Sequence, residues 1–340
     1  MTTFLGIDFA PFKVPLHRRL ETLAALKFVF SFVIMHTMAT LLVLYVVFYT
    51  SYYWLALIYL CWLCYDWHTP SRGGRRAKWY RTWVLWRYFR DYFPAKLIKT
   101  HELDPQYNYV IAYHPHGIMG MGAFIHFGTE ATGVSKLFPG ITPYLMIMKI
   151  LLNLPIVHDY YMLPGCCDVS RDSIEYILEN SERGNACVIL VGGAKESLES
   201  KPGTCLVLLK NRMGFCRMAL KHGAHLVPVY SFGESDLYTQ VDNPEGSKVR
   251  CVQNFMQKLM GFAIPFFHGR GIFNYNFGLL PHRHPINTVV GAPIPVKKIA
   301  EPTRDDLRNL HQIYCEKLKA LFEEHKVNYE GYKDKELIYI

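Results

Sequence analysis

One long apolar run near the N-terminus dominates the hydrophobic pattern. Over residues 23–64 the only formally charged side chain is Lys27. The run is about twice the roughly 20 residues that one helix needs to cross a bilayer, and a polar pair, Thr50–Ser51, interrupts it near its middle. We therefore expect a membrane-embedded hairpin of two helices, over 25–47 and 52–65, the second short enough to be re-entrant. The alternative is a buried helical hairpin in a soluble core.

A basic and aromatic segment follows the hairpin. Four aromatic residues recur at helical spacing along one stripe, and basic residues surround them: Trp79, Trp83, Trp86 and Phe93. Such a helix suits a membrane interface, with aromatic rings at headgroup depth and cations on lipid phosphates. We expect this interfacial helix within 68–100, ended by Pro94. An amphipathic helix packed on the body of the protein is the alternative.

From about residue 101 the pattern changes to short apolar runs that alternate with helical stretches. Runs bounded by turn residues predict strands over 107–114, 185–193, 224–232 and 286–294. Helical periodicity predicts helices over 171–182, 213–222 and 304–326. Alternating strands and helices favour a mainly parallel sheet with helices packed on it. The sequence therefore predicts an α/β domain over 101–340, preceded by an arm (1–22), the hairpin (23–67) and the basic segment (68–100).

Charge is distributed unevenly along the chain. The first 100 residues hold 13 Lys and Arg against 4 Asp and Glu, which accounts for the whole formal net charge of +9. The basic excess thus flanks the apolar run, and the positive-inside rule places both flanks on the cytosolic side. Because the body is neutral, the basic balance does not indicate a nucleic-acid partner.

The nine cysteines are scattered and odd in number. One C-x-x-C, Cys61 and Cys64, lies inside the apolar run with no second pair nearby, so zinc is not expected. Reduced thiols on a cytosolic face fit this pattern.

Two histidines lie at the carboxyl end of the strand expected over 107–114. The sequence there is Tyr-His-Pro-His-Gly, with His114, His116 and Gly117. The carboxyl ends of strands in open α/β sheets are where ligands bind, and the proline and glycine restrict the backbone. A rigidly held imidazole can act as a general base. Metal binding and a purely structural role are the alternatives, and an H-x-H-x-D-H metal motif is not completed.

Two further patterns carry candidate chemistry. Gly192 and Gly193 end the segment expected as a strand over 185–193, and their N–H groups could bind an anion or an acyl oxygen. Glu196, just beyond, is a candidate carboxylate. Arg212 and Arg217, together with Lys210 and Lys221, form a group of cations near a helix start that suits phosphates, with a solvated helix face as the alternative.

These residues resemble the diacylglycerol acyltransferase type 2 family, and most closely its monoacylglycerol acyltransferases. The resemblance covers nearly the whole chain. Its motifs are the tripeptide at 92–94, HPHG at 114–117, FPG at 138–140, VGGAKESL at 191–198, RMGFCRMALKHGAHLVPV at 212–229, SFGE at 231–234 and FHGRG at 267–271. Family members typically have lysine where Met213 stands.

The resemblance implies a glycerolipid-acyltransferase-like α/β domain that transfers an acyl group from acyl-CoA to monoacylglycerol. Diacylglycerol and fatty alcohol are alternative acceptors, and a non-catalytic lipid-binding or droplet-tethering protein is the alternative of another class. A hydroxyl nucleophile needs a base, for which we favour His116 over His114. Glu196 is expected to orient the imidazole.

The expected substrate-binding residues, for acyl-CoA or the oxyanion, are Gly117, Gly192, Gly193, Arg212 and Arg217. Acyl-CoA is a co-substrate, and neither a cofactor nor a metal is expected. The resemblance also implies the endoplasmic reticulum membrane, with the catalytic domain facing the cytosol and lipid droplets as a further location. A homo-oligomer is compatible with these expectations.

Overall fold

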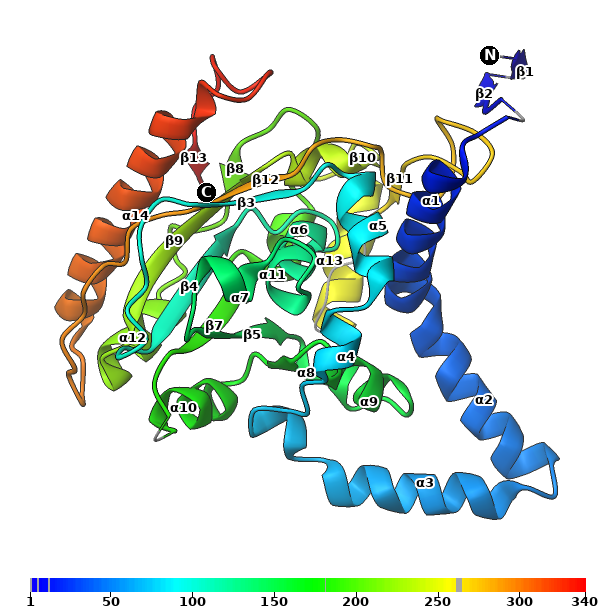
Figure 1. Ribbon diagram of the computed structural model, residues 1–340, viewed down its shortest axis with the longest axis horizontal. Coiled ribbons are helices and arrows are strands. Elements are labelled where there is room, and N and C mark those ends of the chain that lie inside the picture. Colours follow the sequence, from blue (N-terminus) through cyan, green and yellow to red (C-terminus); the bar gives the residue numbers. More distant parts are fainter. Residues whose placement is uncertain (1, 5, 12, 181, 261–264) are drawn as a thin grey trace.

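A central mixed sheet organises the body of the protein. The computed structural model describes residues 2–4, 6–11, 13–180, 182–260 and 265–340. Within them, seven strands pair in the order β3-β12-β9-β4-β7-β5-β6 (Figure 1). Their bounds are Lys96–Lys99 (β3), Tyr109–His114 (β4), Thr142–Ile147 (β5), Cys166–Asp168 (β6), Asn185–Leu190 (β7), His225–Phe232 (β9) and Asn287–Val290 (β12). The predicted α/β class is confirmed.

Five neighbouring strands of this sheet are parallel. β4 pairs in parallel with β7 and β9, and β5 pairs in parallel with β7 and β6. β12 is antiparallel to β9 and parallel to β3, so β12 and β3 run in the direction opposite to the other five strands. All four predicted strands are present, each shorter than expected. β3, β5 and β6 were not predicted, and β3 brings residues 96–99 into the sheet, before the expected start of the domain at 101.

Helices cover both faces of the sheet. One face packs against α10 (Arg171–Glu179), α12 (Gly214–His222) and α14 (Arg304–Lys326). The other packs against α5 (Val84–Tyr92), α6 (Met121–Ala123) and a π-helical turn at Phe124–Gly128. The three helices predicted from periodicity are thus confirmed. The predicted end of the first, at 182, is too late because Asn180 leaves the helical conformation, and position 181 lies outside the described residues.

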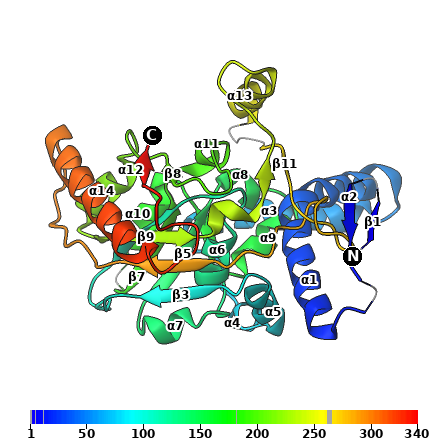
Figure 2. The ribbon, with the colours of Figure 1, turned by 90° about the horizontal axis from the view of Figure 1, so that it is seen from above.

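Most of the remaining elements of the body are short. The helices are α7 (Val134–Leu137), α8 (Lys149–Leu152), α9 (Val157–Met162), α11 (Gly193–Ser197) and α13 (Lys248–Met260). Small sheets pair β1 (Thr2–Phe4) with β2 (Ile7–Phe9), β10 (Thr239–Gln240) with β11 (Phe267–His268), and β8 (Leu206–Val207) with β13 (Ile338–Tyr339). Figure 2 shows α13 standing away from the body.

The apolar run forms helices, but their bounds differ from the expectation. One helix of 34 residues, Leu16–Tyr49, is long and apolar enough to cross a membrane. It comprises α1 (Leu16–Val29), a π-helical turn (Phe30–Ile34) and α2 (Met35–Tyr49). It therefore starts inside the expected N-terminal arm. After the expected turn, α3 (Tyr53–Asp66) follows.

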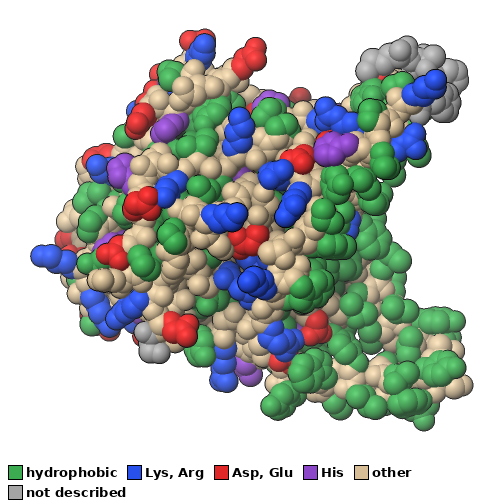
Figure 3. Space-filling model, viewed as in Figure 1, with side chains coloured by type: hydrophobic (Ala, Val, Ile, Leu, Met, Phe, Trp, Pro, Cys, Tyr) green, Lys and Arg blue, Asp and Glu red, His purple; other side chains and the backbone are tan. Residues whose placement is uncertain are grey.

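Only the second half of the run projects from the body. α1 packs against α5, whereas α2 runs away from the body and α3 runs back to it at an angle to α2 (Figure 1). We call α2, α3 and the turn between them the wedge, residues 35–66. Apolar side chains cover the wedge (Figure 3). Its exposed large hydrophobic residues include Leu41, Leu42, Leu44, Phe48, Tyr53, Trp54, Leu55, Leu57, Ile58 and Trp62. This exposure contradicts a helical hairpin buried in a soluble core.

The single charge of the apolar run, Lys27, is held by aromatic residues of the body. Its Nζ lies 4.2 Å from the centroid of the Trp86 ring and 2.8 Å from the hydroxyl of Tyr80. It also donates a hydrogen bond to the hydroxyl of Tyr160. A cation over an aromatic face is attracted by the ring quadrupole. Lys27 therefore fixes α1 to the body.

The expected interfacial helix is two helices with a break. α4 (Lys78–Arg81) ends before Trp83, and α5 begins at Val84. Trp79 and Trp83 are 67% and 42% exposed, whereas Trp86 and Phe93 are buried. The expectation of one exposed stripe is therefore wrong, because the break turns its second half toward the core. Only the first two tryptophans are free to meet a membrane surface.

Candidate active site

Three adjacent parallel strands end at the candidate site. β4 ends at His114, β7 leads into the Gly192–Gly193 turn, and β9 leads through Gly233 to Glu234. Because these strands pair in parallel in the order β7-β4-β9, their carboxyl ends lie at the same edge of the sheet. The structure thus brings the predicted His114–Gly117 loop together with the turn that precedes Glu196.

His116 is the better placed of the two histidines to act as a base. Its side chain is partly exposed, and its Nδ1 lies 3.1 Å from the carbonyl oxygen of Gly117. A carbonyl oxygen can only accept, so this contact assigns the proton to Nδ1 and leaves a lone pair on Nε2. Burial lowers the pKa of His116, opposed by that hydrogen bond. The imidazole is therefore neutral at neutral pH and able to take a proton.

His114 occupies a different environment. It is fully buried, and its Nε2 lies 3.0 Å from the hydroxyl of Tyr314 on α14. That hydroxyl donates to the carbonyl oxygen of Ala112 at 3.1 Å, so it accepts from His114. Burial lowers the pKa of His114 to about 3. Its contacts anchor the strand end to α14, which is a structural role.

Glu196 holds the histidine loop through the main chain. Its Oε1 accepts a hydrogen bond from the N–H of His116 at 2.5 Å, and its Oε2 accepts from the N–H of Leu208 at 2.7 Å. The expectation that it orients the imidazole is wrong, since the imidazole contacts Gly117 instead. Burial raises the pKa of Glu196 to about 7, although both hydrogen bonds lower it. A Cβ on Gly192 would lie 2.0 Å from Oε2, so the carboxylate requires glycine there.

A second buried carboxylate, Glu234, lies on the other side of the same loop. Its Oε2 accepts hydrogen bonds from the N–H of Gly122 at 2.9 Å and the hydroxyl of Tyr113 at 3.2 Å. Its Oε1 is buried without a hydrogen-bond partner among the described residues. Gly117 has φ +64°, and a Cβ there would lie 2.8 Å from Cγ of Glu234. Burial raises the pKa of Glu234 to about 7.

The sequence offered a signal for Glu234 that we did not use. This residue closes the SFGE motif and follows the predicted strand 224–232. The same reasoning that singled out His114 and Gly192 at strand ends applies to it. The loop is thus enclosed by two buried carboxylates, one on each side, and only Glu196 had been a candidate.

The predicted cationic group does not converge on the site. Arg212 is the member that reaches it, donating a hydrogen bond from Nη2 to the carbonyl oxygen of Gly192 at 3.2 Å. Arg217 is exposed on α12, and Lys221 forms an ion pair with Glu175 at 2.7 Å. Gly193 has φ +60° at the start of α11. Arg212 therefore stabilises the Gly192–Gly193 turn. That the turn binds an oxyanion stays a prediction.

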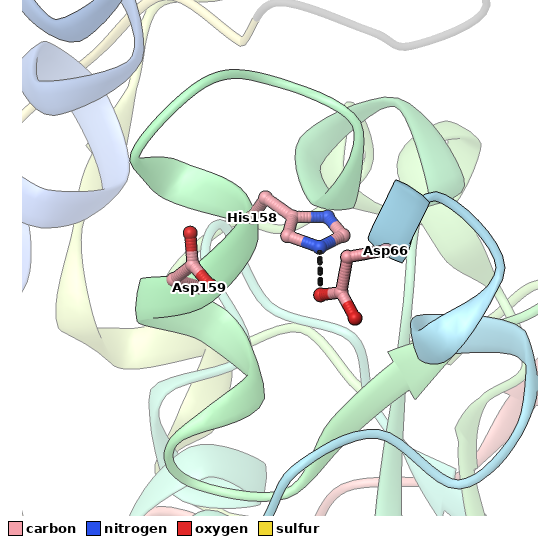
Figure 4. A group of neighbouring side chains, drawn as sticks. All are labelled: Asp66, His158 and Asp159. Atoms are coloured by element: carbon pink, nitrogen blue, oxygen red, sulfur yellow. Dashed lines mark hydrogen bonds and ion pairs between the residues drawn. The ribbon is translucent and has the colours of Figure 1, made fainter. Parts of the chain in front are cut away.

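One group of residues elsewhere has ligand types suited to a metal: Asp66, His158 and Asp159 (Figure 4). The His158 ring nitrogens lie 2.5 Å from the carbonyl oxygen of Leu152 and 2.8 Å from Oδ2 of Asp66. The carboxylate oxygens also accept from other residues: Arg75, Thr69 and Tyr59. With these atoms already engaged, the group serves to fasten the end of α3 to α9.

Comparisons with known proteins identify the family of the chain. A model of the diacylglycerol acyltransferase family matches residues 45–339. The chain is 48% identical to bovine (Bos taurus) 2-acylglycerol O-acyltransferase 1 over 98% of its length and all of that protein. It is 49% identical to human (Homo sapiens) diacylglycerol O-acyltransferase 2 over 92% of its length and 80% of that protein. The acyltransferase PlsC of Thermotoga maritima matches 91% of this chain and 99% of its own at 11% identity and a TM-score of 0.39, too low to support any inference. The resemblance is confirmed, and the chain belongs to the diacylglycerol acyltransferase family.

Proposed function

We propose that the protein is an acyl-CoA:2-acylglycerol O-acyltransferase, which esterifies monoacylglycerol to diacylglycerol in neutral lipid synthesis. The observation that carries the proposal is His116, a neutral and partly exposed imidazole whose Nδ1–H is engaged by a carbonyl and whose Nε2 is available as a base. The identity to bovine 2-acylglycerol O-acyltransferase 1 over that protein's whole length supports the choice of acceptor.

In this reaction Nε2 of His116 takes the proton of the acceptor hydroxyl while the oxygen attacks the thioester carbonyl. A carbon–oxygen bond forms, the carbon–sulfur bond breaks, and the proton passes to the departing CoA thiolate. No covalent acyl-enzyme is needed, since the thiolate is a good leaving group. The N–H groups of the Gly192–Gly193 turn are the candidate donors to the oxyanion. Glu196 and Glu234 keep the loop in place during the reaction.

The wedge supports a membrane location for this chemistry. α1 is fixed to the body by Lys27, and the end of α3 is fixed to it by Asp66 and His158. The chain therefore leaves the body and returns to it, which favours a hairpin embedded from one side. With the basic flanks on the cytosolic side, we place the catalytic domain in the cytosol at the endoplasmic reticulum membrane, with lipid droplets as a further location.

Diacylglycerol is the second candidate acceptor, because the 49% identity to human diacylglycerol O-acyltransferase 2 is equally high. Fatty alcohol is the third. The test is an assay of membranes containing the full-length protein with radiolabelled acyl-CoA and each acceptor in turn. We expect the largest kcat/KM with 2-monoacylglycerol, and a kcat lowered by roughly 10²–10⁴-fold in His116→Ala. Preference for another acceptor would reassign the substrate, and absence of transfer to all three would favour the non-catalytic lipid-binding alternative.

A further inference from the structure

A basic depression lies on the face of the body formed by α4, α5, β3 and α7. Its volume is about 1250 Å³. Seven cationic side chains line it, against two carboxylates, Asp91 and Glu130. The cations are Arg76, Lys78, Arg81, Arg87, Arg90, Lys96 and Lys136. Figure 3 shows Lys and Arg side chains gathered on this face. Because like charges repel one another, this many cations in one depression must be compensated by internal partners or by an anionic ligand.

Among the described residues, internal partners account for three of the seven cations. Arg81 is buried and pairs with Glu130 at 2.8 Å, and Arg90 pairs with Asp91 at 2.7 Å. Arg76 donates to the carbonyl oxygen of a residue on β5. Both carboxylates of the depression are thereby neutralised by cations that also belong to it.

The other four cations are exposed. They are Lys78, Arg87, Lys96 and Lys136, and in the described part of the chain none of their side-chain nitrogens has a hydrogen-bond or ion-pair partner. They come from four separate elements or their edges, so the fold brings them together around one hollow. This leaves an uncompensated positive field over the depression.

The depression is separate from the catalytic loop. None of His114–Gly117, Gly192, Glu196 or Glu234 lines it. Buried aromatic rings stand behind its wall, with Trp86 and Phe124 packed edge to face at 5.1 Å between centroids. A ligand in the depression would therefore not touch the reacting groups.

The rim of the depression carries membrane-facing features. Trp83 lines it and is 42% exposed, and Trp79 and Val84 beside it are 67% and 52% exposed. α4 follows the wedge in the chain, and α5 packs against α1 (Figure 1). Exposed tryptophan beside lysine and arginine is the composition of a membrane interface.

We propose that this depression binds the phosphate headgroup of an anionic phospholipid from the membrane that holds the wedge. The four unpaired cations surround the headgroup, and Trp79 and Trp83 lie at the acyl boundary. The site is distinct from those for acyl-CoA and the acceptor. It would make the placement of the catalytic domain on the bilayer depend on lipid composition, whatever acceptor the enzyme uses.

The test uses the full-length protein in uncharged detergent micelles, with increasing mole fractions of dioleoyl phosphatidic acid or dioleoyl phosphatidylcholine. We expect the anionic lipid alone to raise the temperature of thermal unfolding, and 0.5 M NaCl to weaken the effect. In the variant K78Q/R87Q/K96Q/K136Q, the mole fraction for the half-maximal rise should increase at least about tenfold, since each cation near an anionic surface contributes to binding. The matched control, K297Q/K298Q/K317Q/K319Q, removes four exposed cations on and before α14 and should behave as wild type.

Several outcomes would overturn the proposal. An equal loss in both quadruple variants would show that net charge alone attracts the lipid. The same stabilisation by inorganic phosphate at matched concentration would assign the depression to free phosphate. Stabilisation by coenzyme A, together with a raised KM for acyl-CoA in the first variant only, would assign it to the co-substrate. A failure of acyl transfer to monoacylglycerol would leave the lipid titration unaffected, so the two proposals fail separately.

Discussion

The carboxylate of Glu196 accepts a hydrogen bond from the main-chain N–H of His116 at 2.5 Å. The contact fixes the position of the histidine Cα and leaves the ring to be oriented by the carbonyl of Gly117. Glu196 is therefore a positioning residue, which acts through the loop rather than by a charge on the imidazole. This arrangement favours the neutral form of the proposed base, because within the described residues no carboxylate is hydrogen-bonded to the His116 ring.

The two histidines should respond differently to substitution. His116→Ala should lower kcat by roughly 10²–10⁴-fold, the typical value of general base catalysis, with little change in thermal stability. His114→Ala should lower the unfolding temperature, because it removes a buried partner of Tyr314. Acyl transfer and thermal unfolding of both variants check this. Full activity of a well-folded His116→Ala variant would contradict the assignment of the base.

Glu196→Gln should disturb the loop despite its similar shape. Both carboxylate oxygens accept from N–H groups, so an amide places its NH₂ against one of those donors. The unpaired groups should cost about 1–3 kcal/mol, and the displaced His116 should lower kcat. The free energy of unfolding and kcat are the measurements, and Glu301→Gln, an exposed position, is the control. Loss of activity without loss of stability would point to a direct role of the charge instead.

Glu234 predicts a pH dependence of stability. Burial raises the pKa of Glu234 from 4.5 to about 7 in the folded protein. As pH rises, the folded state therefore keeps the proton up to a higher pH than the unfolded state does. The contribution of protonated Glu234 to the free energy of unfolding is fully present below about pH 4.5 and is lost as pH rises through about 7. In Glu234→Gln the amide oxygen can keep both hydrogen bonds and no proton is lost. The fall in unfolding temperature between pH 5 and 7.5 should therefore be smaller than in wild type, and an unchanged slope would contradict this.

Substitution of the tryptophans in the basic segment can distinguish a role in membrane contact from a role in packing. The double variant W79S/W83S changes only exposed side chains and should reduce activity on long-chain acceptors in bilayers far more than on a short-chain soluble analogue. Trp86→Ser changes a side chain that is 1% exposed and should destabilise the protein by several kcal/mol, with both acceptors affected alike. Equal losses on both acceptors in the double variant would show that Trp79 and Trp83 only pack.

Topology follows from the two attachments of the wedge. Because Lys27 fixes α1 and His158 fixes the end of α3 to the same body, we expect both chain ends on the cytosolic side. Protease added to sealed microsomes should digest tags at the N-terminus and the C-terminus. Protection of one tag until detergent is added would mean a single crossing.

Much of the fold was readable from the sequence where apolar runs were long and bounded by turn residues. The strands before His114, Gly192 and Glu234 were predicted for that reason. β6, at Cys166–Asp168, has only three residues, too few to show a period. The break at Trp83 was missed because the stripe of tryptophans continues across it at helical spacing. Sequence periodicity reports which side chains share a face only as long as the helix is unbroken.

Contacts between distant residues were the part of the site that sequence could not supply. The tie between Glu196 and the His116 N–H joins positions 80 residues apart, and Glu234 lies 112 residues from Gly122. Such contacts can be predicted from a sequence only when the order of the strands in the sheet is known. Glu234 would have been found by applying the strand-end argument to every predicted strand.

The dimensions of the wedge bear on the kinds of surface that the protein can occupy. Its helices have 15 and 14 residues, which at 1.5 Å per residue is about 22 Å and 21 Å, less than the roughly 30 Å of a hydrocarbon core. If the wedge is embedded from the cytosolic side, as we propose, helices that short would add area to that monolayer without adding area to the opposite one. We therefore expect convex, loosely packed monolayers to accommodate it best, and a surface bounded by a single phospholipid layer over stored oil to accept it without rearrangement of the chain.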